Sequence, residues 1–295
     1  MAISDNRANG KTQDLAGRTA IISGAGKGLG RAYALELAAR GARVVVNNRS
    51  HPTDTVRSAD AVVDEIQARG GQAVADDTPV EDATCGQRLL ERALDSFGRL
   101  DIVIANAGVS EAAAFHKQDI GDFRRVVDIN LMGTANLLHA TFSHLYHQRR
   151  GAIVVSSSAA GLYGEHGLPA YSASKAAVIG LCQALALEGA AHGVRVNTIA
   201  PFATTAMTED SLPALLRDKL SPSAVAPVVA WLSGDSCPLN GEVLVAGGGR
   251  LARARTLMTG PCEDKELADG WKALGQPNRD YPSAVAMFQQ FIGGL

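Results

Sequence analysis

The sequence has few cysteines and almost no net charge, and both shortages exclude classes of protein. Lys and Arg total 28 against 30 Asp and Glu, so the formal net charge of −2 at pH 7 draws the chain neither to nucleic acid nor to an anionic membrane. The cysteines form no CxxC pair and have no metal-ligand spacing with histidine, so we interpret them as free thiols in a reducing compartment: Cys85, Cys182, Cys237 and Cys262. No metal site is predicted.

Long apolar runs are also missing. No uninterrupted apolar run approaches the ~18 residues that a membrane span needs. Residues Met1 to Thr12 are polar and lack the apolar region of a signal peptide. We therefore expect no membrane partner and a cytoplasmic location.

Short apolar runs alternate with helix-period segments along most of the chain. The hydrophobic content of 46% and the 31 glycines suit a globular protein with a substantial core. Seven strands are predicted, at Arg18–Ser23, Ala42–Asn47, Gln72–Ala75, Asp101–Ala105, Ala152–Ser156, Val194–Thr198 and Glu242–Val245. Helical patterns separate them, including long ones at Phe123–Tyr146 and Tyr171–Ala191.

Several of these strands, such as Ile102–Ile104, are apolar without alternation, which is typical of a parallel sheet covered on both faces. We predict an α/β, doubly wound Rossmann fold with a seven-stranded parallel sheet. The expected organisation is a polar tail at residues 1–13, the Rossmann-type domain at 14–249 and a C-terminal extension at 250–295.

The extension carries apolar residues on two short helix-like stretches, roughly Glu263–Leu274 and Ser283–Phe291. Such residues favour docking on the body of the protein or on a neighbouring subunit. Two hypotheses stay open at this point. The extension is either a lid over the substrate or a purely structural brace.

A glycine cluster lies where the first predicted strand turns into the first helix. Glycines at 24, 28 and 30 allow a tight turn and let backbone N–H groups approach a pyrophosphate, whose charge is favoured by the helix N-terminus. A glycine-rich loop alone can be a simple turn. Its position between strand and helix favours dinucleotide binding.

Asn48 directly follows the second predicted strand and lies 20 positions beyond Gly28, where NAD-binding folds usually carry a carboxylate for the ribose hydroxyls. The absent carboxylate removes a repulsion, and Arg49 is able to pair with a 2′-phosphate. Both features favour NADP(H) over NAD(H). The alternative is that Arg49 is an ordinary solvated charge at a strand end.

A tyrosine and a lysine four residues apart open a predicted long helix. This spacing places Tyr171 and Lys175 on one face, where the lysine charge stabilises a phenolate that would otherwise form only near pH ~10. Ser158 lies 13 residues upstream, at the carboxyl end of the fifth predicted strand, the edge at which open α/β sheets bind ligands.

These motifs together resemble the short-chain dehydrogenase/reductase family over roughly residues 16–249. The family's TGxxxGxG is matched by Ser23, Gly24, Gly28 and Gly30, with serine in place of threonine. Its NNAG is matched by Ala105–Gly108, with alanine in place of the first asparagine. Its catalytic tetrad is matched by Asn130, Ser158, Tyr171 and Lys175. Two departures are Asn48 and Phe202, which follows Pro201 where the family often has glycine.

The resemblance implies hydride transfer between nicotinamide and a secondary alcohol or ketone. Tyr171 would be the acid/base, Ser158 would bind the substrate oxygen, Lys175 would lower the Tyr171 pKa, and Asn130 would position a proton-relay water. It further implies a homodimer or homotetramer. The implied cofactor contacts are Ser23, Gly24, Lys27, Gly28, Leu29, Gly30, Asn48, Arg49, Thr78, Val80, Asn106, Ala107, Gly108, Tyr171, Lys175 and Thr205.

Framework segments such as Gly28–Leu35 and Asn197–Pro201 resemble one branch, the (3R)-hydroxyacyl-CoA dehydrogenase unit of the peroxisomal multifunctional enzyme and its bacterial relatives. This branch implies a 3-hydroxyacyl-CoA or 3-oxoacyl thioester as substrate. A steroid or another bulky secondary alcohol is the alternative. A non-catalytic dinucleotide-sensing regulator or a scaffold subunit is disfavoured, because neither needs the complete tetrad.

Overall fold

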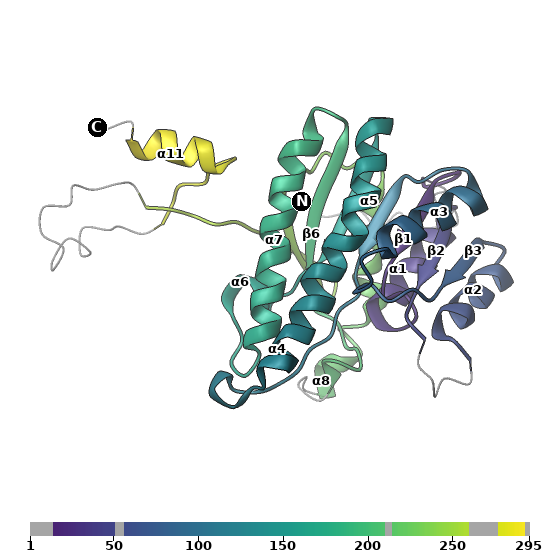
Figure 1. Ribbon diagram of the computed structural model, residues 1–295, viewed down its shortest axis with the longest axis horizontal. Coiled ribbons are helices and arrows are strands. Elements are labelled where there is room, and N and C mark those ends of the chain that lie inside the picture. Colours follow the sequence, from purple (N-terminus) through teal and green to yellow (C-terminus); the bar gives the residue numbers. More distant parts are fainter. Residues whose placement is uncertain (1–13, 51–55, 210–213, 260–276, 293–295) are drawn as a thin grey trace, which may run out of the picture. The chain divides into compact units, whose positions relative to one another are not determined.

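The computed structural model describes residues 14–50, 56–209, 214–259 and 277–292. They fall into two compact units, one that extends to Arg253 and one that begins at Ala254. The first holds a doubly wound α/β sheet (Figure 1). The predicted tail at residues 1–13 and the predicted helix at Glu263–Leu274 lie outside the described residues.

One sheet has the strand order β3-β2-β1-β4-β5-β6-β7-β8. Strands β1 to β7 pair in parallel, which confirms the predicted parallel, doubly wound fold. The strand order reverses between β1 and β4, the position at which open α/β sheets bind ligands. The strands are β1 Thr19–Ile22, β2 Arg43–Asn47, β3 Gln72–Asp76, β4 Ile102–Ala105, β5 Gly151–Ser156, β6 Val194–Pro201, β7 Val243–Gly247 and β8 Arg250–Ala254.

The prediction of seven strands is wrong by one, because β8 extends the sheet beyond β7. The connection is only two residues long, and both Gly248 and Gly249 have positive φ, 55° and 74°. A two-residue turn with positive φ at both positions joins antiparallel neighbours, so β8 returns alongside β7. The strand consists of Arg, Leu and Ala residues, of which all but Ala254 are exposed, and it has no β-branched residue that would indicate a strand in the sequence.

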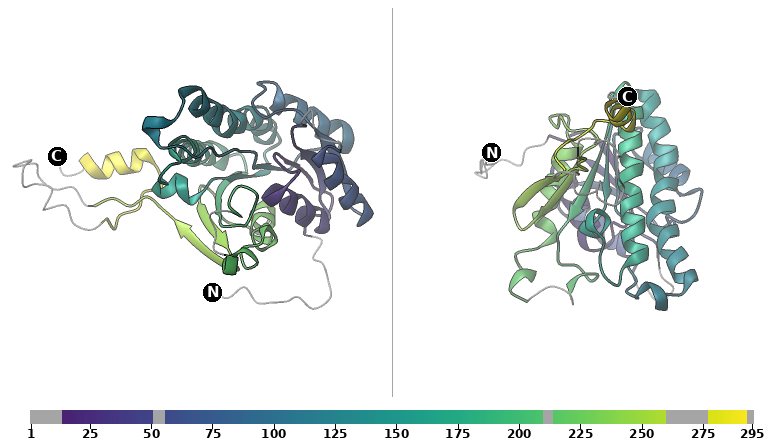
Figure 2. Two further views of the ribbon diagram at one scale, coloured as in Figure 1. Left: turned by 90° about the horizontal axis from the view of Figure 1, so that it is seen from below. Right: turned by 90° about the vertical axis from the view of Figure 1, so that its left-hand side faces the viewer.

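Helices cover both faces of the sheet. Alternate residues of the inner strands point to opposite faces, so that Val154 of β5 packs in one apolar cluster while Ile153 and Val155 pack in the other. The first cluster is covered by α1 Gly28–Ala39, α2 Ser58–Ala68 and α9 Ala226–Ser233. The second is covered by α3 Cys85–Phe97, α5 Gly133–Gln148 and α7 Pro169–Ala190, of which α5 and α7 run beside each other (Figure 2).

The long helix predicted at Phe123–Tyr146 consists of three joined segments. They are α4 Ile120–Val127, a π-helical turn at Asp128–Met132, and α5. A π turn has an additional residue and often occurs at functional sites. Here it contains Asn130, one of the predicted site residues.

Helix α7 is 22 residues long, and an 18-residue window within it has a mean hydropathy of 1.3, so by length and composition alone it could span a membrane. Serine, lysine and glutamine residues interrupt its apolar sequence, so it does not form a continuous apolar run. It packs against β6, α4 and α6 Ala159–Tyr163, as helices on a covered sheet face do.

The second unit contains α11 Ala284–Ile292, close to the helix-like stretch predicted at Ser283–Phe291. Val285, Phe288 and Phe291 of this helix are exposed. A bridge between Met258 and Arg279 joins two parts of this unit.

Candidate active site

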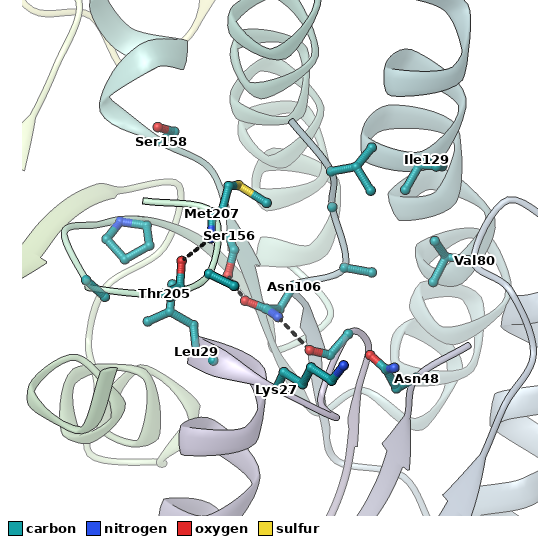
Figure 3. A pocket seen from close by; sticks show the side chains of 18 of the residues that line it. Lys27, Leu29, Asn48, Val80, Asn106, Ile129, Ser156, Ser158, Thr205 and Met207 are labelled. Atoms are coloured by element: carbon teal, nitrogen blue, oxygen red, sulfur yellow. Dashed lines mark hydrogen bonds between the residues drawn. The ribbon is translucent and has the colours of Figure 1, made fainter. Parts of the chain in front are cut away.

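A cavity of about 420 Å³ opens at the carboxyl ends of the central strands. Its lining comes mainly from the segments that follow β1, β2, β3, β4, β5 and β6. Lys27 and Asn48 lie at one end of it and Ser158 lies at the other (Figure 3). The sheet thus collects at one edge residues that are widely separated in the sequence.

The glycine loop has a backbone that side chains would not allow. Gly24 and Gly28 have positive φ, 61° and 53°. A Cβ on Gly30 would lie 2.2 Å from the carbonyl oxygen of Gly24, and one on Gly24 would lie 2.7 Å from Cα of Ala107. Because these glycines have no side chain, the loop lies directly against the segment after β4.

Hydrogen bonds join these two segments. The Ser23 hydroxyl oxygen accepts from the backbone N–H groups of Asn106 and Ala107 at 3.0 and 3.2 Å. The Asn106 side-chain amide donates to the carbonyl oxygens of Ser23 and Gly24 at 3.3 and 3.2 Å. Serine in place of the family's threonine therefore still supplies the required acceptor.

The loop fits the pyrophosphate of a dinucleotide. Helix α1 begins at Gly28, so its first N–H groups have no partner within the helix and favour an anion. Lys27 precedes the helix and lines the cavity, as do Gly24, Gly28 and Leu29. Thr205 comes from the segment after β6 and packs beside the loop, 3.3 Å from where a Gly28 Cβ would be.

The far end of the cavity is lined by Asn48, Arg49, Ser58, Val80 and Glu81. The Asn48 side-chain amide donates to the Ser58 hydroxyl at 2.8 Å and to the Arg49 carbonyl at 3.1 Å. Asn48 is therefore fixed by protein contacts. The close approach requires Gly26, because a Cβ there would lie 2.3 Å from the Ser58 hydroxyl oxygen.

Ser158, Tyr171 and Lys175 converge at the other end. Ser158 follows β5 and caps α6, its hydroxyl accepting from the Ala160 N–H at 3.2 Å. Tyr171 is in the first turn of α7, and the Nζ of Lys175 lies 5.8 Å from the centroid of its ring. Lys175 is 4% exposed and donates to the Ser156 carbonyl at 2.7 Å.

Burial dominates the protonation of both groups. Burial raises the pKa of Tyr171, and a hydrogen bond with Ser158 partly offsets this effect. Burial lowers the pKa of Lys175 to about 8. The site therefore has a phenol that stays protonated and a lysine that titrates slightly above neutral pH.

Asn130 lies behind this group and is fully buried. Its side-chain amide donates to the Val109 carbonyl at 2.9 Å and to the Ser174 hydroxyl at 3.0 Å, while its Oδ1 accepts from the Val109 N–H at 2.8 Å. The Ser174 hydroxyl in turn donates to the Tyr171 carbonyl at 2.8 Å. Asn130 thus links the segment after β4 to the helix that carries Tyr171 and Lys175.

The structure brings most of the predicted site residues to the cavity wall. Four lie behind it instead, namely Ser23, Gly30, Thr78 and Asn130. Sequence reasoning missed several lining residues, which are Asn47, Ser58, Glu81, Val109, Ile129, Ser156, Ser157, Pro201, Ala203, Ala206, Met207 and Thr208. Ser156 and Ser157 could have been predicted, because they precede Ser158 at the carboxyl end of a strand. No sequence pattern indicates that Ser58 and Glu81 line the cavity.

Comparisons with known proteins agree with this geometry. A model of the short chain dehydrogenase family matches residues 18–214. The chain is 37% identical over 293 residues to peroxisomal multifunctional enzyme type 2 of Mus musculus, which covers 95% of this chain and 39% of that protein. It is 40% identical over 197 residues to a 3-oxoacyl-[acyl-carrier-protein] reductase of Synechocystis, which covers 66% and 78%.

A crystal structure of a short chain dehydrogenase from Mycobacterium avium superposes with a TM-score of 0.81 at 34% identity. The match covers 91% of this chain and 99% of that one. The chain spans well under half of the mouse multifunctional enzyme. The likeness to that enzyme therefore concerns one part of it.

Proposed function

Because the chain belongs to the short chain dehydrogenase family and is an NAD(P)-dependent oxidoreductase, we propose that it interconverts a 3-hydroxyacyl thioester and its 3-oxoacyl form, with NADP(H) preferred. One observation carries the proposal. Ser158, Tyr171 and Lys175 lie at one end of a cavity whose other end holds the glycine loop and Arg49.

The nicotinamide, when bound, supplies or accepts the hydride at its C4 carbon. The residues of this chain bind the substrate oxygen and exchange a proton with it. Tyr171 donates a proton to the carbonyl oxygen during reduction and takes it back during oxidation. The Ser158 hydroxyl donates a hydrogen bond to the same oxygen, where negative charge develops.

Lys175 supports Tyr171 from within the protein. Its ammonium, held by the Ser156 carbonyl, favours the phenolate that Tyr171 becomes after giving up its proton. Asn130 fixes the two segments on which this arrangement depends and would hold the relay water that the family resemblance implies.

The preference for NADP(H) rests on charge at the other end of the cavity. Lys27 and Arg49 line it, and position 48 is an amide rather than a carboxylate. A 2′-phosphate would be attracted by both cations and would meet no carboxylate at the end of β2.

The thioester proposal is supported by the substrate that the Synechocystis relative's name states and by apolar residues in the lining of the cavity that contains Ser158. Val109, Ala203, Ala206 and Met207 provide that lining, which suits an acyl chain.

A substrate and cofactor panel tests the proposal. We expect the highest kcat/KM with 3-oxoacyl thioesters and NADPH, and little activity with bulky cyclic ketones. The double variant Asn48→Asp, Arg49→Leu should shift the preference toward NADH. Higher kcat/KM with NADH in the wild type refutes the cofactor assignment, and higher kcat/KM with cyclic ketones refutes the thioester assignment.

A further inference from the structure

Arg49 is paired across the cavity wall with an acid that the family motifs do not include. Glu81 lies in the connection between β3 and α3, and its Oε1 is 3.3 Å from Nη1 of Arg49. Both residues line the cavity, and the side chains of Arg49 and Glu81 are 36% and 34% exposed, respectively. The cation that would recognise a 2′-phosphate therefore already has a carboxylate partner within the site.

The neighbouring acids have other partners. Asp76 accepts from the Asn47 side-chain amide at 3.1 Å and from the Thr78 N–H at 2.8 Å. Oδ2 of Asp77 lies 3.3 Å from Nη1 of Arg57. Among the described residues that line the cavity, Glu81 is the one carboxylate, so it alone is positioned to compete with a phosphate for Arg49.

We propose that Glu81 determines how strongly the protein prefers NADP(H), because it holds the Arg49 guanidinium that a 2′-phosphate must take over. The inference rests on the proposed role of Arg49 toward NADP(H). An exposed ion pair is weak, whereas a guanidinium–phosphate pair makes two parallel hydrogen bonds and carries more charge. The 2′-phosphate therefore displaces the Glu81 carboxylate from Arg49. The carboxylate still competes for the guanidinium and repels the phosphate, which weakens NADP(H) binding.

NAD(H) lacks the 2′-phosphate and has nothing to gain from Arg49 at this position. Its binding leaves the Arg49–Glu81 pair intact. Glu81 consequently lowers the affinity for one cofactor and leaves the other unchanged, which makes it a specificity-determining residue.

The test is a double-mutant cycle read by nucleotide fluorescence, which needs no substrate. The Kd values of NADPH and NADH are measured for the wild type, Glu81→Gln, Arg49→Gln and the double variant. Glu65→Gln is the control, since it removes one negative charge that pairs with Arg31 and Arg69 outside the cavity lining.

We expect Glu81→Gln to tighten NADPH binding about threefold to fivefold, the upper part of the range for a partly exposed charge pair. NADH binding and the Glu65→Gln control should change less than about twofold. In the Arg49→Gln background the gain for NADPH should disappear. A gain that persists without Arg49, or no gain at all, overturns the proposal.

The two proposals fail in different ways. Tighter binding of NADH than NADPH by the wild type counts against the proposed cofactor preference alone. The Glu81 effect compares NADPH affinities between variants, so it succeeds or fails whichever cofactor the wild type prefers.

Discussion

Replacing Lys175 by methionine should make the protein more stable at neutral pH while removing its activity. The lysine is almost fully buried, and its one hydrogen bond shown by the structure goes to the Ser156 carbonyl. Methionine has a similar length and no charge, so Lys175→Met keeps the packing and removes both the buried ammonium and this hydrogen bond.

The magnitude follows from the pKa of Lys175, which burial lowers from 10.5 to about 8. At about 1.4 kcal/mol per pKa unit, the folded state loses about 3 kcal/mol at pH 7 by holding this group charged. Loss of the hydrogen bond costs the variant about 1 kcal/mol. The expected net gain for Lys175→Met is therefore about 2 kcal/mol at pH 7.

The gain has a defined pH dependence. Between pH 8 and 10.5 the unfolded chain binds a proton at Lys175 that the folded protein does not, so the stability of the wild type rises with pH in this window. The advantage of the variant should accordingly decline from about 2 kcal/mol at pH 7 to about zero at pH 10.

Urea unfolding of both proteins at pH 7 and pH 10, at equal protein concentration and without added nucleotide, measures this difference. Lys117→Met is the control, because Lys117 is exposed and should give no pH-dependent gain. An equal loss of stability for Lys175→Met at both pH values would show that the buried lysine is not destabilising and refute the reasoning.

Three further outcomes are expected. Tyr171→Phe should lower kcat by roughly a hundredfold or more while leaving the Kd of NADPH unchanged, because only proton transfer is lost; near-normal turnover contradicts its role. Light scattering should give the mass of a dimer or tetramer, since the π-helical turn before α5 and helix α7 expose apolar groups such as Met132 and Leu187, and a monomer at micromolar concentration argues against this. Truncation after Ala254, which keeps β8, should alter substrate KM and kcat if the extension is a lid; a much lower melting temperature without a kinetic change identifies a brace instead.

The parallel sheet could be predicted because its inner strands are short, apolar and bounded by turn residues. Ile102–Ala105 and Gly151–Ser156 are buried along their whole length, so burial on both faces produced an unambiguous pattern. β8 could not be recognised from the sequence. An exposed edge strand needs no buried apolar face, and Arg250–Ala254 has no β-branched or aromatic residue that would indicate a strand.

The catalytic end of the site was predictable for a different reason. Tyr171 and Lys175 are one helical turn apart, so their proximity is a local property of the sequence. Glu81 and Arg49 are 32 residues apart and meet only because β3 lies beside β2. No local sequence pattern indicates such a contact. The hydrogen bond between Asn48 and Ser58 could not be predicted for the same reason.

The hydrogen bonds between Ser23 and the backbone of Asn106 and Ala107 have a consequence for how the cofactor is received. They tie together the two segments that flank the reversal of strand order, and these bonds are made by the protein alone. The walls are thus preorganised, and a dinucleotide that enters does not have to order them. Less conformational entropy is lost on binding, so more of the contact energy remains as affinity. Ser23→Ala should accordingly weaken both NADPH and NADH, even though Ser23 lies behind the cavity wall.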